Sequence, residues 1–241
     1  MWEYFKKEAE KFNISLNSEQ TEQFKLFYEI LKDYNEKVNL ISSTDLEFLI
    51  NRHFLDSLSF GILKDKIELN KKLNIIDIGI GGGFPGIPLI IAFPEWKLTA
   101  VDSIGKKTKF IDILTKKLGI NERVEVINAR AEELAHKEEY RCRFDFSVSR
   151  AFGGLNVLVE LCLPFLKKNG YLVSYKAKTP DTEVNLSQNA MKELGGVLHG
   201  ILNYTLPSEN YIERNLIIVK KEFDTPSVYP RKANLIKRKP L

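Results

Sequence analysis

The sequence predicts an α/β protein in which a mostly parallel β-sheet follows a set of N-terminal helices. Over the first seventy residues, apolar side chains recur every three or four positions, as on one face of an amphipathic helix. From residue 73 onward, short apolar runs rich in β-branched residues alternate with helical stretches. This alternation is typical of a parallel sheet covered by helices. The runs are almost continuously apolar, as expected of strands buried on both faces.

Two helices are predicted in the N-terminal segment. The first spans about 17–40, with its N-cap at Asn17 or Ser18 and with the apolar positions Phe24, Phe27, Leu31, Tyr34 and Val38. The second begins near Ser43, and its apolar side holds Leu46, Leu49, Ile50, Phe54, Leu58 and Ile62.

Seven strands are predicted after these helices. Five parallel strands are expected at 73–79, 97–103, 123–129, 144–150 and 170–177. A helix around 182–194 precedes two more strands, 196–206 and 215–223, whose short polar connection makes them antiparallel. We therefore divide the chain into an N-terminal helical extension (1–70), a sheet domain (71–223) and a basic C-terminal tail (224–241).

Charge is concentrated at the C-terminus. The net charge is +4, from 36 basic and 32 acidic residues, and residues 229–241 carry five basic residues and no acid, which leaves −1 for the rest (4 − 5). Such a tail suits an anionic partner, nucleic acid first, or it serves only as a solvated tail. The last dozen residues lack apolar periodicity and are expected to be disordered on their own.

Composition excludes several classes of protein. The apolar stretch near the glycines is too short to span a bilayer, and the charged N-terminus does not resemble a signal peptide. Cys142 and Cys162 are the only cysteines, and neither belongs to a metal-ligand cluster. We expect a cytoplasmic protein with reduced thiols, without a membrane partner and without a metal site.

A glycine-rich turn, DIGIGGGFPGIPL (77–89), follows the first predicted strand. Ligands bind at this edge of a doubly wound sheet, and glycines let the backbone approach them closely. Phe84 stands where a dinucleotide fingerprint needs a small residue, and no Gly-Lys-Ser/Thr of a P-loop follows. Pro85 is expected to occupy the first position of the next helix.

The remaining pattern suits an adenosyl cofactor. Asp77 is followed by Gly79, Gly81 and Gly83, and a second acid, Asp102, ends the next strand. An acid at that position accepts hydrogen bonds from both ribose hydroxyls of a nucleoside. The glycines can then pass the backbone close to the amino-acid part of the cofactor.

These features resemble the class I methyltransferases, which use S-adenosylmethionine and have a Rossmann-like fold. More closely, the chain resembles the bacterial RsmG (GidB) family from about Phe27 to Lys232, in the runs YNEKVNL…RHFLDSL, DIGIGGGFPGIPL, VDSIGKKTKFID, NARAEEL and FDFSVSRAF. The resemblance implies methyl transfer to N7 of a loop guanine in 16S ribosomal RNA, within the small ribosomal subunit or its precursor.

The resemblance also implies cofactor contacts at Gly79, Phe84, Ala131, Glu132 and Arg150. Arg150 ends an apolar strand, where an unpaired charge is costly. In a functional role at the ligand edge, Arg150 pairs with an anionic ligand or with Asp77. In a purely structural role, it forms an internal ion pair with Asp77 or Asp145. His53 and Asp56 lie three apart on the second helix, and we favour a buried, hydrogen-bonded pair that ties this helix to the sheet. Asn35 and Asn39 also match the family, in a turn or a substrate role.

Cationic residues are the predicted contacts with RNA: Lys106, Lys107, Lys176, Arg231 and Lys232. The family has Arg where Lys107 stands and Lys-Gly where Lys176-Ala177 stands, so the details of these contacts differ here. RNA must present the base unpaired, because side chains cannot read the deep groove of an RNA duplex.

No catalytic side chain is predicted, because guanine N7 already has a free lone pair and the rate gain comes from alignment. The fourth strand ends in Ser149-Arg150-Ala151-Phe152, without the Asn/Asp-Pro-Pro-Phe/Tyr run of enzymes that methylate the adenine amino group. A methyltransferase of a small-molecule acceptor and a non-catalytic RNA-binding protein stay open as alternatives.

Overall fold

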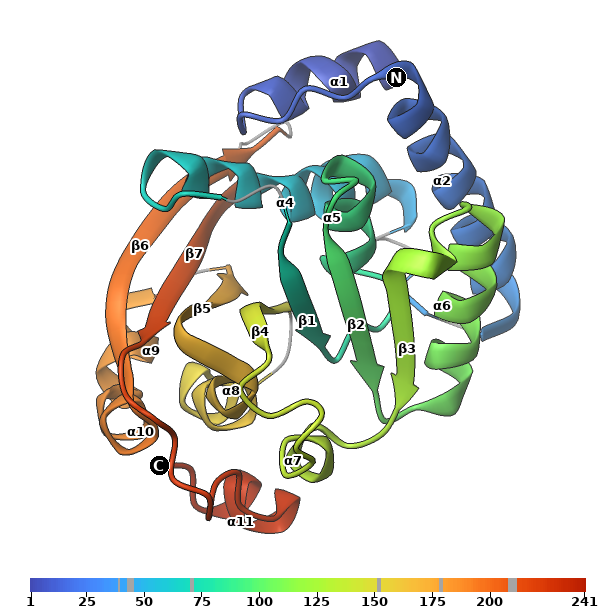
Figure 1. The fold of residues 1–241 in the computed structure, drawn as a ribbon. Coiled ribbons are helices and arrows are strands. Elements are labelled where there is room, and N and C mark those ends of the chain that lie inside the picture. The colour runs from blue at the N-terminus through green and yellow to red at the C-terminus, as the bar shows by residue number, and fades with distance from the viewer. Residues whose placement is uncertain (39, 43–45, 70–71, 151–152, 178–179, 208–211) are drawn as a thin grey trace.

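A single seven-stranded sheet organises the chain (Figure 1). The computed structural model describes residues 1–38, 40–42, 46–69, 72–150, 153–177, 180–207 and 212–241. The strands are β1 (Asn74–Ile78), β2 (Lys97–Asp102), β3 (Val124–Asn128), β4 (Phe144–Arg150), β5 (Leu166–Lys176), β6 (Gly196–Leu206) and β7 (Ile212–Lys221). Their order is β3-β2-β1-β4-β5-β7-β6, and only β7 runs antiparallel to its neighbours. The predicted fold class is therefore confirmed.

Helices flank and connect the strands. At the N-terminus lie α1 (Trp2–Glu10), α2 (Ser18–Val38), the π-helix η1 (Ile50–Leu55), α4 (Asp56–Leu58) and the 3-10 helix η2 (Ser59–Asp65). Between the strands lie α5 (Gly86–Ala92), α6 (Gly105–Lys117), η3 (Asn121–Arg123), α7 (Ala131–Leu134), α8 (Leu155–Cys162), η4 (Leu163–Phe165), α9 (Pro180–Leu186) and α10 (Gln188–Leu194). The chain ends with α11 (Ala233–Arg238).

Two hydrophobic cores cover the two faces of the sheet. One joins α1, α2, α5 and α6 to the sheet, and the other joins α7, α8 and α10 to its opposite face. The start of α2 follows the sequence prediction, because the amides and side chains of Asn17 and Gln20 hydrogen-bond reciprocally at 2.8 and 2.9 Å in a capping box. Helix α5 begins one residue later than predicted, with Pro85 as its N-cap.

The second N-terminal helix is not the single helix that periodicity predicts. Its proposed start at Ser43 lies outside the described residues, and from Ile50 onward it is a π-helix, a short α-helix and a 3-10 helix in succession. Side-chain hydroxyls bind the backbone here: Ser57 Oγ donates to the carbonyl of His53 at 2.6 Å and Ser59 Oγ to that of Asp56 at 2.7 Å. Such local bonds compete with regular helical geometry, and periodicity does not reveal them.

Two further segments differ from their prediction. The helix expected around 182–194 is split into α9 and α10 at Ser187, whose side chain bonds the carbonyl of Glu183 at 2.6 Å. The tail, expected to be disordered alone, contains α11 and lies against α7 (Figure 1). The division into three parts stays a prediction, although α1 and α2 share one core with the sheet.

Candidate active site

The carboxyl ends of β1, β2, β3 and β4 enclose a cavity of about 200 Å³. Five of the eight predicted cofactor residues line this first cavity: Gly79, Asp102, Ala131, Glu132 and Arg150. The other three, Asp77, Gly81 and Phe84, do not line it.

Asp102 is fixed at the wall of the first cavity. Its carboxylate accepts hydrogen bonds from the backbone amides of Ile104 at 2.9 Å and Gly81 at 3.1 Å. Gly81 makes this contact with φ at +57°, a conformation that glycine adopts without strain. Lys107 Nζ, a predicted RNA contact, lies 3.8 Å from the same carboxylate and lines the first cavity.

Asp77 is fully buried in β1. Burial raises the pKa of its carboxyl well above the ordinary value, and the hydrogen bond from the Gly86 amide, 2.8 Å long, lowers it in part. Its other oxygen, Oδ1, has no hydrogen-bond partner among the described residues. A buried carboxylate oxygen that lacks a partner is suited to a cationic ligand group.

The segment after β3 frames the same cavity. Ala131 begins α7. The small side chain of Ala131 and the side chain of Glu132 line the cavity. Arg130 Nη1 lies 3.9 Å from Glu132 Oε1.

Arg150, the last residue of β4, joins the N-terminal helices to the sheet. Its Nη1 donates to Asp56 Oδ2 at 3.0 Å and to the backbone carbonyl of Arg52 at 3.1 Å. Its Nη2 contacts Nδ1 of His53, which acts as acceptor because a guanidinium has only donors. The guanidinium also lies 5.0 Å from the centre of the Phe84 ring.

The carboxylate that pairs with Arg150 is thus Asp56, and neither of the two predicted structural partners. Asp145 pairs with Lys167 at 2.7 Å near the start of β4, and Asp77 makes no ion pair with Arg150. The prediction that His53 and Asp56 tie this helix to the sheet is correct, and they do so through Arg150. Asp56 also accepts a 2.7 Å hydrogen bond from the hydroxyl of Tyr204.

A second cavity, of about 430 Å³, lies on the other side of Arg150 at the ends of β4 and β5 and the start of β7. It is lined by Arg52, His53, Asp56, Arg150, Tyr175, Lys176, Ala177, Ile212 and Arg214. Arg52, Tyr175 and Arg214 are not among the residues predicted from the sequence. The register offers one signal for Tyr175, because it pairs with Arg150 across adjacent strands.

The other predicted RNA contacts have varied surroundings. Lys176 is nearly buried and binds Glu183 at 2.7 Å and the carbonyl of Gly153 at 2.8 Å. Lys106 is exposed and reaches the carbonyl of Val38 at 3.4 Å.

Among the two asparagines of the family match, Asn35 has a turn role. Its side chain accepts from the amides of Leu40 and Ile41 at 2.7 and 2.9 Å. Asn39, like the Ala151-Phe152 pair after β4, lies outside the described residues.

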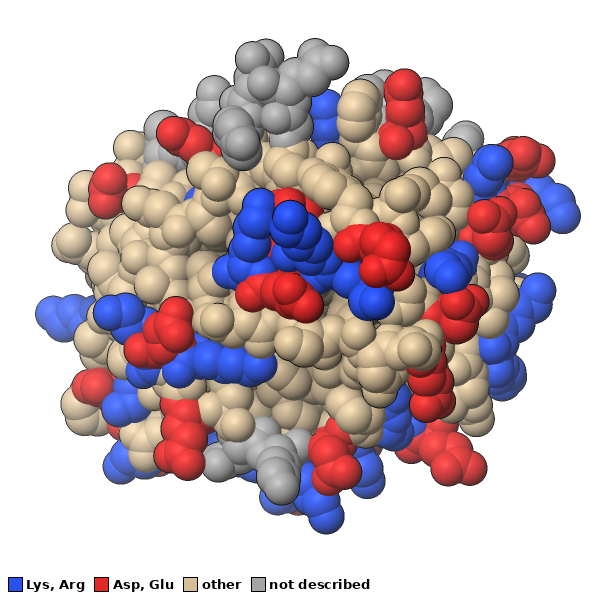
Figure 2. All heavy atoms as spheres, turned by 90° about the horizontal axis from the view of Figure 1, so that it is seen from above, with Lys and Arg blue, Asp and Glu red and all other residues tan. Residues whose placement is uncertain are grey.

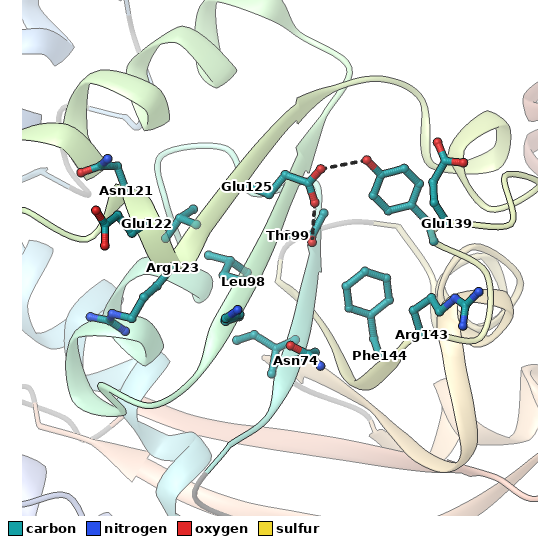
Figure 3. A pocket seen from close by; sticks show the side chains of 14 residues that line it. Asn74, Leu98, Thr99, Asn121, Glu122, Arg123, Glu125, Glu139, Arg143 and Phe144 are labelled. Carbon is teal, nitrogen blue, oxygen red and sulfur yellow. Dashed lines mark hydrogen bonds between the residues drawn. The ribbon is translucent and has the colours of Figure 1, made fainter.

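A third hollow, of about 530 Å³, lies away from this edge, around the amino ends of β1, β2 and β4 (Figure 3). There the Glu125 carboxylate accepts hydrogen bonds from Tyr140 at 2.8 Å and Thr99 at 3.2 Å. Glu125, one of three acids in its lining, is thus occupied by neighbouring hydroxyls, and none of the predicted site residues lines this hollow.

The family model for GidB, described as rRNA small subunit methyltransferase G, matches residues 20–212. The chain belongs to the GidB family. The ribosomal RNA small subunit methyltransferase G of Acetivibrio thermocellus is 41% identical over 234 residues, which cover 97% of this chain and 93% of that protein. The protein of the same name from Bacillus velezensis is 39% identical over 99% of this chain and 98% of its own length.

Comparison of structures gives the same fold. The crystal structure of precorrin-6y C5,15-methyltransferase from Geobacter metallireducens is similar at a TM-score of 0.51 and 19% identity, over 68% of this chain and 87% of that one. The predicted family, the class I methyltransferase fold and S-adenosylmethionine as cofactor are therefore confirmed for this GidB-family protein.

None of the described helices is long and apolar enough to cross a membrane. Among the residues that the structure describes, no group of three or more His, Cys, Asp or Glu side chains is placed to hold a metal ion.

Proposed function

We propose that this GidB-family protein transfers a methyl group from S-adenosylmethionine to N7 of a loop guanine in 16S ribosomal RNA. Its substrate is the small ribosomal subunit or its precursor, in the cytoplasm. One observation carries the proposal beyond family membership: two cavities at the carboxyl edge of the sheet meet at Arg150. A cofactor and an acceptor base in neighbouring cavities can bring their reacting atoms to the ~3–3.5 Å of a reactive pair.

The first cavity suits the cofactor. Asp102 presents a fixed carboxylate to ribose hydroxyls, and Ala131 and Glu132 leave room for adenine. Asp77 does not line this cavity, and its buried Oδ1, which lacks a partner among the described residues, would take the cationic amino group of the cofactor once the glycine turn opens to admit it. The backbone of Gly81 would pass close to the bound cofactor. The ring of Phe84 would support the cofactor from behind Arg150.

The cofactor supplies an electrophilic methyl group on a sulfonium. Guanine N7 is unprotonated at neutral pH, so no side chain has to remove a proton from it. The product base is cationic, and a bare positive charge beside N7 would oppose its formation. The charge of Arg150 is already balanced by Asp56 at 3.0 Å, so Arg150 can form the wall between the cavities without that penalty.

The second cavity suits an unpaired nucleotide. Arg52 and Arg214 line it and provide positive charge toward phosphate or guanine O6, whereas the charge of Lys176 is already paired with Glu183. Lys106, exposed beside the cofactor cavity, is a further candidate for a phosphate contact. On the described part of the face seen in Figure 2, basic and acidic side chains are interleaved, so that face is a poor surface for a polyanion.

Labelled S-adenosylmethionine and small subunits from cells that lack this gene test the proposal. We expect label at N7 of one loop guanine. Asp102→Asn should weaken cofactor binding, whereas Arg214→Gln should raise KM for the RNA substrate and leave the cofactor Kd unchanged.

Lys168→Gln is the matched control for Arg214→Gln, because this exposed lysine near the start of β5 is remote from both cavities. Cofactor binding without labelling of RNA would instead favour a small-molecule acceptor. RNA binding that is strong but independent of Asp102 and without methyl transfer would favour the non-catalytic alternative.

A further inference from the structure

The C-terminal tail is anchored by a buried ion pair. Glu160, on α8, is fully buried and receives three hydrogen bonds from Arg231: from its backbone amide at 2.8 Å, from Nε at 2.8 Å and from Nη2 at 2.6 Å. Arg231 was predicted to contact RNA. Its guanidinium is instead neutralised inside the protein, where it serves as an anchor for the residues around it.

Further contacts hold the segment that leads to this anchor. The guanidinium of Arg141 donates to backbone carbonyls of the tail at 2.9–3.1 Å, those of Thr225, Pro226 and Tyr229. His136 Nε2 lies 2.9 Å from the carbonyl of Pro230. Side chains between β3 and β4 thus bind consecutive turns of the tail backbone, so the start of the tail is built into the fold.

The anchored tail extends the active-site edge. A hollow of about 620 Å³ lies between α7 and α11, and Lys232 and Lys237 are among the residues that line it. Arg130 and Glu132 line both this hollow and the cofactor cavity. Because Arg150 lines both the cofactor cavity and the acceptor cavity, the three hollows follow one another from Arg214 past Arg150 to Lys237, and we refer to this row of hollows as the groove.

The tail end of this groove has an excess of exposed positive charge. Arg130, Lys232 and Lys237 are exposed there, and Glu133 is the exposed acid among the described residues that line the hollow. Glu132 lies inward, with only 12% of its side chain exposed and its carboxylate toward Arg130. The three exposed cations outnumber the two acids of the lining, so the hollow offers an excess of about one positive charge to a polyanion.

We propose that the anchored tail is a fixed wall of the RNA groove, and that Arg130, Lys232 and Lys237 bind backbone phosphates of the RNA that flanks the target nucleotide. This inference rests on the proposed function and assigns a further binding site to it. A fixed wall, unlike a flexible arm, adds cations whose positions are already set when RNA arrives, so less conformational entropy is lost on binding.

The salt dependence of RNA binding tests the proposal. The logarithm of the association constant falls with the logarithm of salt concentration by about 0.7 per phosphate contact on single strands. The double variant Lys232→Gln/Lys237→Gln should therefore reduce this slope by about 1.4 for a 16S RNA fragment, with an unchanged Kd for S-adenosylmethionine. Lys117→Gln/Lys168→Gln removes the same charge from exposed positions outside the groove and should leave the slope unchanged.

A third variant separates a fixed wall from a flexible arm. Glu160→Gln keeps every cation of the tail and removes only the anion that holds Arg231, so the slope should fall toward that of the double variant. Limited proteolysis should then cut the tail faster. If the double variant keeps the wild-type slope, Lys232 and Lys237 do not bind phosphates. If Glu160→Gln keeps the wild-type slope, the tail does not act as a fixed wall. If the wild type binds cofactor but no RNA, the proposed function itself fails.

Discussion

Asp77→Asn should make the protein more stable and its cofactor binding weaker. The carboxyl of Asp77 is fully buried, and burial raises its pKa well above the ordinary value. Asparagine has the same shape and can still accept the hydrogen bond from the Gly86 amide, 2.8 Å away. The substitution thus removes the cost of a buried ionisable group and keeps the packing.

The magnitude depends on pH in a defined direction. Because the folded-state pKa is raised, the folded protein binds more protons than the unfolded chain once the pH exceeds about 3.9, the ordinary pKa of Asp. Wild-type stability therefore falls as pH rises from there to the folded-state pKa, by about 1.4 kcal/mol per pH unit. At pH 7 the loss has an upper limit of about 4 kcal/mol, and the asparagine variant avoids it.

Thermal unfolding of both proteins between pH 4.5 and 8 measures this effect. One kcal/mol corresponds to roughly 2–4 °C in Tm for a chain of this size, so the variant should melt several degrees higher at pH 7 and nearly level with wild type at the acid end. Ser174→Ala is the matched control, because its buried hydroxyl also lacks a partner among the described residues but does not titrate. A Tm difference that is constant with pH would refute the reasoning.

Cofactor binding should change in the opposite direction. An asparagine cannot balance the positive amino group of S-adenosylmethionine, so calorimetry should show a Kd at least about tenfold higher, equivalent to about 1.4 kcal/mol. An unchanged Kd would place the amino group away from Asp77 and leave its unpartnered oxygen unexplained.

Three other predictions concern packing, hydrogen bonding and thiol chemistry. A Cβ on Gly61 would lie 1.9 Å from a backbone oxygen, whereas none of the described atoms lies within 4 Å of a Cβ placed on Gly200. Denaturant unfolding should therefore show that Gly61→Ala lowers the free energy of unfolding by about 3 kcal/mol or more, and that Gly200→Ala lowers it little or not at all. Tyr204→Phe removes a 2.7 Å hydrogen bond to a buried carboxylate and should cost about 1.5–3 kcal/mol by the same assay; a smaller loss would mean that water replaces the hydroxyl. Iodoacetamide at pH 8 should label exposed Cys142 and spare Cys162 until unfolding, because burial raises the pKa of Cys162 to about 12; equal labelling of the folded protein would contradict this.

Much of the fold could be predicted because its signals are local. Continuous apolar runs indicated strands buried on both faces, and the short polar connection indicated the antiparallel pair β6 and β7. The glycine turn and Asp102 lie where parallel strands end, so a common edge followed from the topology. Local capping at Asn17 and Gln20 was equally visible, because the partners are three residues apart.

The pairings that define the site are not local. Arg150 and Asp56 are 94 positions apart, and Arg231 and Glu160 are 71 apart. A charge at the end of an apolar strand requires an anion, but the chain has 32 acids, and sequence spacing cannot decide among them. The order of the tail could not be predicted for the same reason, since it comes from a buried glutamate on another helix and not from the tail's own periodicity.

The N-terminal helices contact the candidate site as well as the core. Phe27 of α2 stacks on Phe84 of the glycine turn, with ring centres 5.3 Å apart, and the same Phe84 ring lies beneath Arg150. Asp56 and His53 also bind that arginine. The cofactor turn, the wall between the two cavities and the helical extension therefore share contacts, so loosening the extension should impair cofactor and RNA binding together.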